Sequence, residues 1–319
     1  MRMMMAALAA MFSVASAQAQ PYPSRPITVV VPFPAGGPSD VVARIVAEQM
    51  GKVLGQSLVI ENVGGAGGSI GSARVAAVAP DGYTLLAASM GSHVAAPILV
   101  AGARYDPLRD FEPIGLTAHA PVVIVARKDF PAKDLTEFVA SLKQKSGDIK
   151  QGHGGVGASS HMACLLFTAE LGVHPNTIAY RGTGPAMNDL LGGHIDFLCE
   201  QAVSVIGQIT SGAVKAYAVS GDRRLVTLPE VPTAAEAGVN YRMSVWAAMF
   251  APRRTPPDIV KKLNAALDQA LDDPSVQKRV GDLGGTVPAK GERSAEAFAA
   301  YLKAEVARWS PILKAASGN

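Results

Sequence analysis

The strongest constraint on the fold is a repeated local order, in which a short β-branched run ends in a glycine-rich turn that opens an amphipathic helix. Residues 29–46, VVVPFPAGGPSDVVARIV, show this order first, after a strand that begins at Ile27. Further strands are expected at 58–61 and 84–88, with a helix at 72–79 between them. This alternation predicts an α/β fold whose mostly parallel sheet is covered by helices on both faces.

The same design recurs after Pro121. PVVIVARKD is an expected strand, DLTEFVASLKQK is an expected helix, and two further glycine turns each open a helix. The apolar stripes Ile259 to Leu271 and Phe298 to Trp309 predict C-terminal helices that pack back on the first unit. A chain of this length accommodates two lobes joined by crossing strands. We expect one lobe to comprise 20–120 plus 243–319 and the other 121–242.

The first nineteen residues, 1–19, are expected to be a secretory signal peptide. Arg2 precedes an apolar core from Met3 to Val14, and small residues at Ala15, Ala17 and Ala19 fit a cleavage pattern. The core is too short to span a membrane, and no later stretch has about 18 uninterrupted apolar residues. The mature chain is therefore expected to be a soluble periplasmic protein.

The composition excludes several classes of function. With 49% apolar and 17% charged residues, the chain has enough material for a packed core. The formal charge of +3 comes from scattered Lys and Arg without a basic stripe, which argues against nucleic-acid binding. The histidines lack the spacing of metal ligands. In GGAGGSIG, Ile70 stands where a dinucleotide fingerprint needs its third glycine. We expect neither metal nor cofactor.

Cys164 and Cys199 are the two cysteines of the chain. In an exported protein they meet an oxidising compartment and could form a disulfide. The alternative is a pair of buried free thiols. Zinc is disfavoured, because two cysteines without further ligands at a suitable spacing do not complete a four-ligand site.

The first glycine turn, PFPAGGPSD at 32–40, has the features of an anion site. Gly36 and Gly37 free the backbone, and Ser39 or Asp40 could cap the helix that follows. Helix N-termini expose unpaired N–H groups and carry a partial positive charge, so they could hold a carboxylate without Lys or Arg. The alternative is a capped turn with no ligand.

Three further loops carry the same neutral, hydroxyl-rich pattern: ASMGSH at 88–93, GVGASSH at 155–161 and YRGTGPA at 180–186. Ligands of open α/β sheets bind beyond the carboxyl ends of the strands, so facing lobes would bring these loops into one cleft. In these loops, His161 is either a ligand contact or a polar residue of a first helical turn. Arg181 could pair with a second carboxylate, point to solvent or bridge the lobes.

A catalytic function has little support in the sequence. No G-x-S-x-G elbow occurs, and the adjacent Ser160 and His161 do not form a dyad merely by adjacency. An exported hydrolase of carboxylate esters is therefore a minor alternative to a binding receptor. A periplasmic sensor for a signalling system is the other alternative, because a sensor needs the same closing lobes.

Six segments occur in order along nearly all of the mature chain: YPSRPITVVVPFPAGGPSD, NVGGAGGSIGSARVAAVAPDGYTLL, YDPLRDFEPIG, GVGASSH, YRGTGPAMNDLLGGHIDF and LPEVPTAAEAG. Together they resemble the Bug family, the extracytoplasmic substrate-binding receptors of tripartite tricarboxylate transporters. The resemblance implies a two-lobed periplasmic-binding-protein (Venus-flytrap) fold that closes on a small organic carboxylate, which is a di- or tricarboxylate or an aromatic acid. It also implies a monomer that delivers its ligand to transporter membrane subunits.

The resemblance further implies which residues bind. In such receptors a carboxylate sits against backbone amides of the first strand–helix turn, and the second lobe adds hydroxyls and amides. With His161 added from the loop pattern, the candidate ligand-binding residues are Phe33, Ala35, Gly36, Gly37, Ser39, Asp40, Ser89, Gly157, Ser159, Ser160, His161, Tyr180, Gly182, Thr183 and Asp196. The pattern CLLF…DFLCEQ resembles a subset of the family whose two cysteines lie close enough to bond, which implies a disulfide between Cys164 and Cys199.

Overall fold

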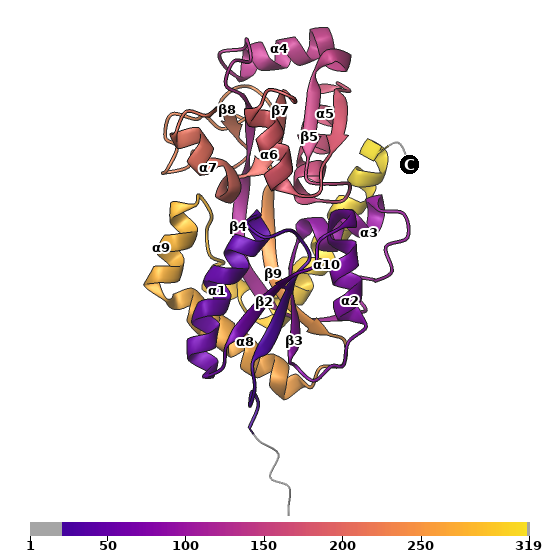
Figure 1. Cartoon of the computed structure of the whole chain (residues 1–319), viewed down its shortest axis with the longest axis vertical. Coiled ribbons are helices and arrows are strands. Elements are labelled where there is room, and N and C mark those ends of the chain that lie inside the picture. The colour runs from indigo at the N-terminus through magenta and orange to yellow at the C-terminus, as the bar shows by residue number, and fades with distance from the viewer. Residues whose placement is uncertain (1–20, 318–319) are drawn as a thin grey trace, which may run out of the picture.

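The computed structural model describes residues 21–317 as two α/β lobes (Figure 1), so the expected signal peptide lies outside the described residues. The strands are β1 (Ile27–Val31), β2 (Leu58–Asn62), β3 (Thr84–Ser89), β4 (Phe111–Arg127), β5 (Lys150–His153), β6 (Asn176–Ala179), β7 (Phe197–Gln201), β8 (Val214–Val219) and β9 (Ser244–Pro252). The α-helices are α1 (Pro38–Leu54), α2 (Ser69–Ala76), α3 (Ala96–Leu99), α4 (Leu135–Lys145), α5 (Ser159–Leu171), α6 (Thr183–Leu191), α7 (Ala202–Thr210), α8 (Pro257–Asp272), α9 (Pro274–Asp282) and α10 (Ala295–Ser317). Within this part of the chain, no helix is long and apolar enough to cross a membrane.

The strands follow the order β2-β1-β3-β9-β4-β7-β5-β6, and β8 pairs with β4. β1 is parallel to β2 and β3 in the first lobe, and β5 is parallel to β6 and β7 in the second. The 17-residue β4 belongs to both lobes, because its first part pairs with β9 and its last part with β7 and β8. The lobe boundaries at 121 and 243 stay predictions, and residue 121 lies inside β4, at the transition between these two sets of partners.

Local signals in the sequence explain the start and end of α1. Pro38 occupies its first turn, where a missing N–H costs no hydrogen bond, and Gly55 ends it in the left-handed conformation. The helix buries Val42, Ile45 and Met50 against the first lobe's sheet. The helix expected at 72–79 is α2, which begins at Ser69 and ends at Ala76.

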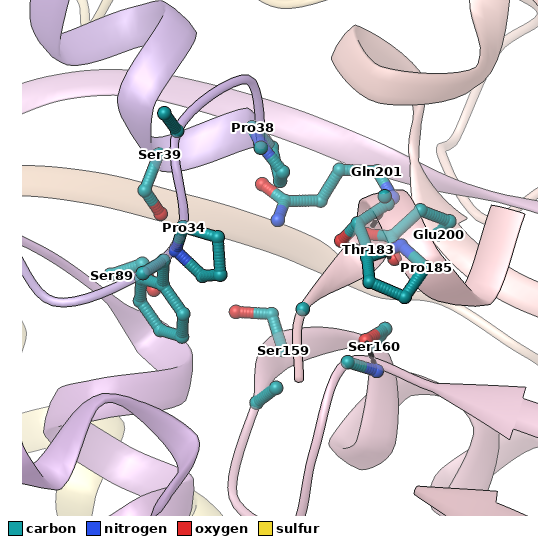
Figure 2. Close-up of a pocket in the computed structure, with 17 residues that line it drawn as sticks. Pro34, Pro38, Ser39, Ser89, Ser159, Ser160, Thr183, Pro185, Glu200 and Gln201 are labelled. Atoms are coloured by element: carbon teal, nitrogen blue, oxygen red, sulfur yellow. Dashed lines mark hydrogen bonds between the residues drawn. The ribbon is translucent and has the colours of Figure 1, made fainter. Parts of the chain in front are cut away.

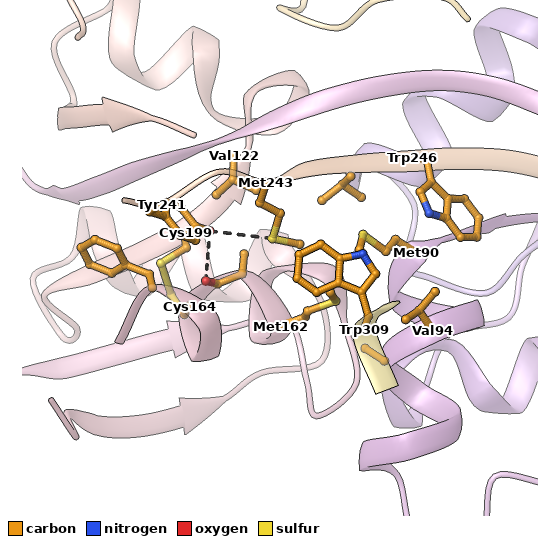
Figure 3. Close-up of a cluster of buried hydrophobic side chains, with 14 of the residues drawn as sticks. Met90, Val94, Val122, Met162, Cys164, Cys199, Tyr241, Met243, Trp246 and Trp309 are labelled. Carbon is orange, nitrogen blue, oxygen red and sulfur yellow. Dashed lines mark hydrogen bonds between the residues drawn. A yellow bond between two sulfur atoms is a disulfide. The ribbon is translucent and has the colours of Figure 1, made fainter. Parts of the chain in front are cut away.

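One buried cluster extends from the first lobe into the second and joins them (Figure 3). It includes Met90 of the first lobe, Met162 of the second and both tryptophans. The indole N–H groups of Trp246 on β9 and Trp309 on α10 both donate to the buried carboxylate of Glu305, each at 3.1 Å. The C-terminal helix is thereby fixed against β9, which pairs with β3 and with the first part of β4 (Figure 1).

Cys164 of α5 and Cys199 of β7 form a disulfide, as the family resemblance implied (Figure 3). Both cysteines are completely buried. The bond ties the first half of α5 to the middle of β7.

We predict that the double substitution Cys164→Ala/Cys199→Ala lowers the free energy of unfolding. The sequence separation is 35 residues. A loop of this size gives about 3–4 kcal/mol in the chain-entropy model. Urea unfolding of the variant and of the oxidised wild type measures the difference, and wild type unfolded in reductant serves as the control. A change below about 1 kcal/mol would contradict the loop-closure account.

Candidate functional site

Four helices begin at one cavity between the lobes, each directly or shortly after a parallel strand. α1 follows β1, α5 follows β5, α6 follows β6 and α7 follows β7. The side chains of Ser39, Ser159 and Gln201 point into the shared space (Figure 2). The cavity has a volume of about 60 Å³ and is lined by Phe33, Pro34, Ala35, Gly37, Pro38, Ser39, Ser89, Gly154, Ala158, Ser159, Ser160, Gly182, Thr183, Gly184, Pro185, Glu200 and Gln201. No Lys or Arg lines it, and Glu200 is the one charged residue among these.

Asp40 holds the first turn in shape rather than facing the cavity. Its carboxylate accepts hydrogen bonds from the Gly36 N–H at 2.9 Å, from Asn62 at 2.9 Å and from Arg44 at 2.9 Å. Burial alone would raise the pKa of Asp40, but these hydrogen bonds together hold it below its usual range. Gly36 adopts φ +78°, a conformation that glycine reaches without strain.

The start of α1 leaves backbone donors free beside the cavity. Within the described residues, the N–H groups of Ser39 and Asp40 have no hydrogen-bond partner, and no side chain caps the helix. Both residues are buried. Buried N–H groups are almost always paired, so these two are positioned for an acceptor that comes from outside the chain.

Ser89, at the end of β3, adds a second unsatisfied group. It lines the cavity and is 2% exposed, and its hydroxyl has no hydrogen-bond partner among the described residues. A buried hydroxyl without a partner costs free energy. A ligand oxygen in the cavity would remove that cost.

The second lobe contributes hydroxyls and one acid. The Ser160 hydroxyl accepts a hydrogen bond from the Gly154 N–H at 3.0 Å, and Thr183 donates to Glu200 at 2.9 Å. Burial raises the pKa of Glu200 to about 7, against the hydrogen bonds that it receives from the Gln201 N–H, Thr183 and Ser160.

A larger cavity of about 880 Å³ adjoins the first and shares Phe33, Pro34, Gly154 and Gly182 with it. Its other walls come from the glycine-rich loop at 64–70, from 99–101 and from the loop that carries Tyr180 and Arg181. The Tyr180 hydroxyl donates to Asp189 at 2.6 Å, which fixes the ring. The site thus has a small inner part at the helix N-termini and a wide outer part.

Bare glycine backbone forms the closest contacts between the lobes. A Cβ on Gly91 would lie 2.6 Å from the Ser159 nitrogen, and one on Gly182 would lie 2.7 Å from Pro34 Cγ. A hydrogen bond from the Gly91 N–H to the Ser159 hydroxyl, 3.1 Å long, also crosses between the lobes. The lobes are therefore closed against each other, and no side chain larger than hydrogen fits at these points.

The structure brings nine of the predicted residues to the inner cavity: Phe33, Ala35, Gly37, Ser39, Ser89, Ser159, Ser160, Gly182 and Thr183. Tyr180 lines the outer cavity. Gly36 and Asp40 support the turn at 32–40 behind the inner cavity. Gly157 donates its N–H to His161 Nδ1 at 3.3 Å, and the His161 ring packs on His153 with centroids 4.3 Å apart, away from both linings.

Asp196, the last of the predicted residues, lines neither cavity. It precedes β7, whereas the cavity lies at the other end of that strand, where Glu200 and Gln201 stand. Asp196 accepts hydrogen bonds from Arg127 and the Lys150 N–H, each at 2.8 Å. A strand's carboxyl end, not its start, faces the crevice of a parallel sheet, and that rule would have selected Glu200.

The inner lining contains eight residues that the prediction did not include: Pro34, Pro38, Gly154, Ala158, Gly184, Pro185, Glu200 and Gln201. Six of them flank predicted residues within the same loops, so their place in these loops was the sequence signal that could have identified them as lining residues. Glu200 and Gln201 come from a strand end that carries no glycine motif.

The fold and the site define a two-lobed solute-binding protein of the periplasmic type, as the sequence predicted. Residues 42–317 match the family model described as the tripartite tricarboxylate transporter family receptor, and the chain belongs to this family. It is 44% identical to the periplasmic binding protein BugD, with a TM-score of 0.88 over 93% of this chain and 99% of that one. The resemblance to the Bug family is thereby confirmed.

Two other solved structures of similar proteins contain ligands. MatC from Rhodopseudomonas palustris, solved with bound malate, is 42% identical, with a TM-score of 0.88 over 92% of this chain and 100% of that one. An R. palustris protein solved with adipate is 30% identical, with a TM-score of 0.88 over 93% and 98% of the two chains.

We predict that Gly91→Ala opens the cleft. The added Cβ would meet the Ser159 nitrogen of the other lobe. Overpacking of this kind costs about 1–3 kcal/mol, and it destabilises only the closed arrangement of the lobes. Small-angle X-ray scattering should show a larger radius of gyration than in wild type. Gly207→Ala on α7 is the matched control, because nothing lies within 4 Å of its added Cβ. Equal radii for the two variants would contradict the prediction.

Proposed function

We propose that this protein is a receptor that binds a small organic carboxylate between its lobes, with one carboxylate group at the N-termini of α1, α5, α6 and α7. The convergence of these N-termini on a cavity without Lys or Arg carries the proposal. Each N-terminus offers unpaired N–H groups and a partial positive charge, so several together favour an anion. The unpaired N–H groups of Ser39 and Asp40 and the Ser89 hydroxyl supply specific donors.

A site of this kind suits transport. Amide and hydroxyl donors hold a carboxylate without the stronger attraction of a fixed cation, so release needs only lobe opening. We propose that the receptor works in the periplasm as a monomer, since one chain supplies the whole lining, and that it delivers its ligand to transporter membrane subunits. The division at residues 121 and 243 would then mark the hinge between the lobes.

We propose a dicarboxylate as the ligand class. The inner cavity has room for little more than one carboxylate, while the outer cavity extends from it to Arg181. Arg181 is exposed, and it takes part in none of the ion pairs between described residues. A second carboxylate on a chain that passes Phe33 and Gly182 would meet this guanidinium. The malate and adipate in the two similar structures support the same class.

A thermal-shift screen of the mature protein, refolded to remove carried-over ligand, tests the function. The panel contains aliphatic and aromatic mono-, di- and tricarboxylates. A ligand at 100 times its dissociation constant stabilises the folded state by about 2.7 kcal/mol, which raises the midpoint visibly. A shift with dicarboxylates supports the proposal, and no shift with any carboxylate would overturn it.

We predict that Ser89→Ala weakens binding of the best dicarboxylate by about 2- to 12-fold. One hydrogen bond from the Ser89 hydroxyl to a ligand oxygen contributes about 0.5–1.5 kcal/mol to binding. The substitution removes no bond within the protein, because this hydroxyl has no partner among the described residues. Isothermal titration calorimetry measures the change. Ser141→Ala, on the exposed side of α4, is the control and should bind as wild type does. Unchanged affinity in Ser89→Ala would remove this hydroxyl from the site.

We also predict that Arg181→Ala discriminates ligands by their second carboxylate. Binding of adipate should weaken by about 2- to 5-fold, because an exposed ion pair contributes up to about 1 kcal/mol. Binding of a monocarboxylate of similar length should not change. Equal effects on both ligands, measured by calorimetry, would show that Arg181 does not read the second carboxylate.

A further inference from the structure

Glu200 is a buried acid inside the proposed carboxylate site. It stands at the carboxyl end of β7, lines the inner cavity and is 1% exposed. Its two oxygens accept hydrogen bonds from the Gln201 N–H at 3.1 Å and from Thr183 at 2.9 Å, and Ser160 is a third donor. The side chain therefore joins the first turns of α5 and α6 to the end of β7 (Figure 2).

Among the described groups around Glu200, no positively charged side chain pairs with its carboxylate. On the neighbouring elements of the second lobe, β5 contributes His153, α5 contributes His161 and α6 contributes Asp189, while α7 and residues 122–126 of β4 contain no titratable side chain. Lys150 is exposed at the opposite end of β5, and Glu170 is exposed toward the far end of α5. Burial lowers the pKa of His153 to about 4 and lowers that of His161 as well, so both are neutral at neutral pH. Asp189 is occupied by the Tyr180 hydroxyl.

The groups across the cavity do not compensate it either. Asp40 of α1 is bonded to Arg44, and Arg181 lies on the outer cavity rather than the inner one. The hydroxyl and amide donors stabilise the ionised form of Glu200, but burial outweighs them and leaves its pKa near neutrality.

A ligand carboxylate in the inner cavity of about 60 Å³ would lie close to this acid, which lines it. Two carboxylates confined together cannot both ionise at neutral pH without strong repulsion, and one of them keeps a proton. The protonated partner then donates a hydrogen bond to the ionised one, so the repulsive pair becomes an attractive one.

We propose that Glu200 holds the ligand as a carboxylic acid, donating its proton in a hydrogen bond to a ligand carboxylate oxygen. This inference rests on the proposed function and names the chemistry of its inner subsite. On binding, one ionised Glu200, one ligand carboxylate and one proton from solvent combine to form the closed complex. Opening the lobes at higher pH returns both the ligand and the proton.

The test is calorimetric titration of malate and adipate into the full protein at pH 6, 7 and 8. At each pH, two buffers of different ionisation enthalpy give the number of protons taken up. Both ligands are essentially dianions at pH 7 and above, because ordinary aliphatic carboxyl pKa values are about 4. With a pKa of about 7 in the free protein, uptake should rise from about 0.1 proton per ligand at pH 6 to about 0.9 at pH 8. Affinity should fall about tenfold over the same range.

Glu200→Gln is the informative variant, because an amide keeps both a donor for the ligand and an acceptor for Thr183. It should bind with nearly the same affinity at pH 6 and pH 8 and take up almost no proton. Glu170→Gln, an exposed position toward the far end of α5, removes the same charge and should keep the wild-type uptake. Circular dichroism and thermal midpoints establish that both variants are folded.

The outcomes separate the two proposals. Ligand binding by wild type without proton uptake at pH 8, or unchanged uptake in Glu200→Gln, would overturn the role of Glu200 and leave the receptor function standing. Loss of binding at every pH in a folded Glu200→Gln would also overturn it, since the protonated form would then not be the binding form. Absence of binding to any carboxylate in both proteins would overturn the proposed function and this inference with it.

Discussion

The structure depends on one recurrent constraint, which is that the first turn of a helix has N–H groups with no partner inside the helix. This chain places four such turns at the carboxyl ends of its parallel strands and points them at one cavity. In the proposed function the backbone itself is the main recognition surface, and Lys and Arg are absent from the inner lining. Glycine, alanine and serine are frequent in the lining, and they leave the backbone at these turns accessible from the cavity.

The same constraint explains why the lobes meet through glycine. Backbone donors from both lobes reach one small ligand only when the lobes approach within van der Waals contact, and a side chain at Gly91 or Gly182 would prevent this. The disulfide joins α5 to β7 in the second lobe, and the buried Trp246–Glu305–Trp309 contact joins α10 to β9.

Much of the fold was predictable because its signals are local. Apolar periodicity predicted β1, α1, α8 and α10, and the glycine turns predicted the loops that line the cavity. β9 was not predicted, because SVWAAMFAP is apolar on both faces and has no alternation to mark it as a strand. The first part of β4 was also missed, since Pro113, Gly115 and Pro121 interrupt the pattern. Both segments are held by pairing with each other, which a linear pattern does not display.

The sequence by itself determined the α/β class, the helix-opening turns and the family, because these follow from residue spacing and motif order. Only the tertiary structure decided which of the loop residues share a cavity. Strand direction placed Glu200 in the site and Asp196 at the opposite end of the same strand, although the two are four residues apart. Burial raises the pKa of Glu200 to about 7, and burial is a property of the assembled lobes rather than of any segment.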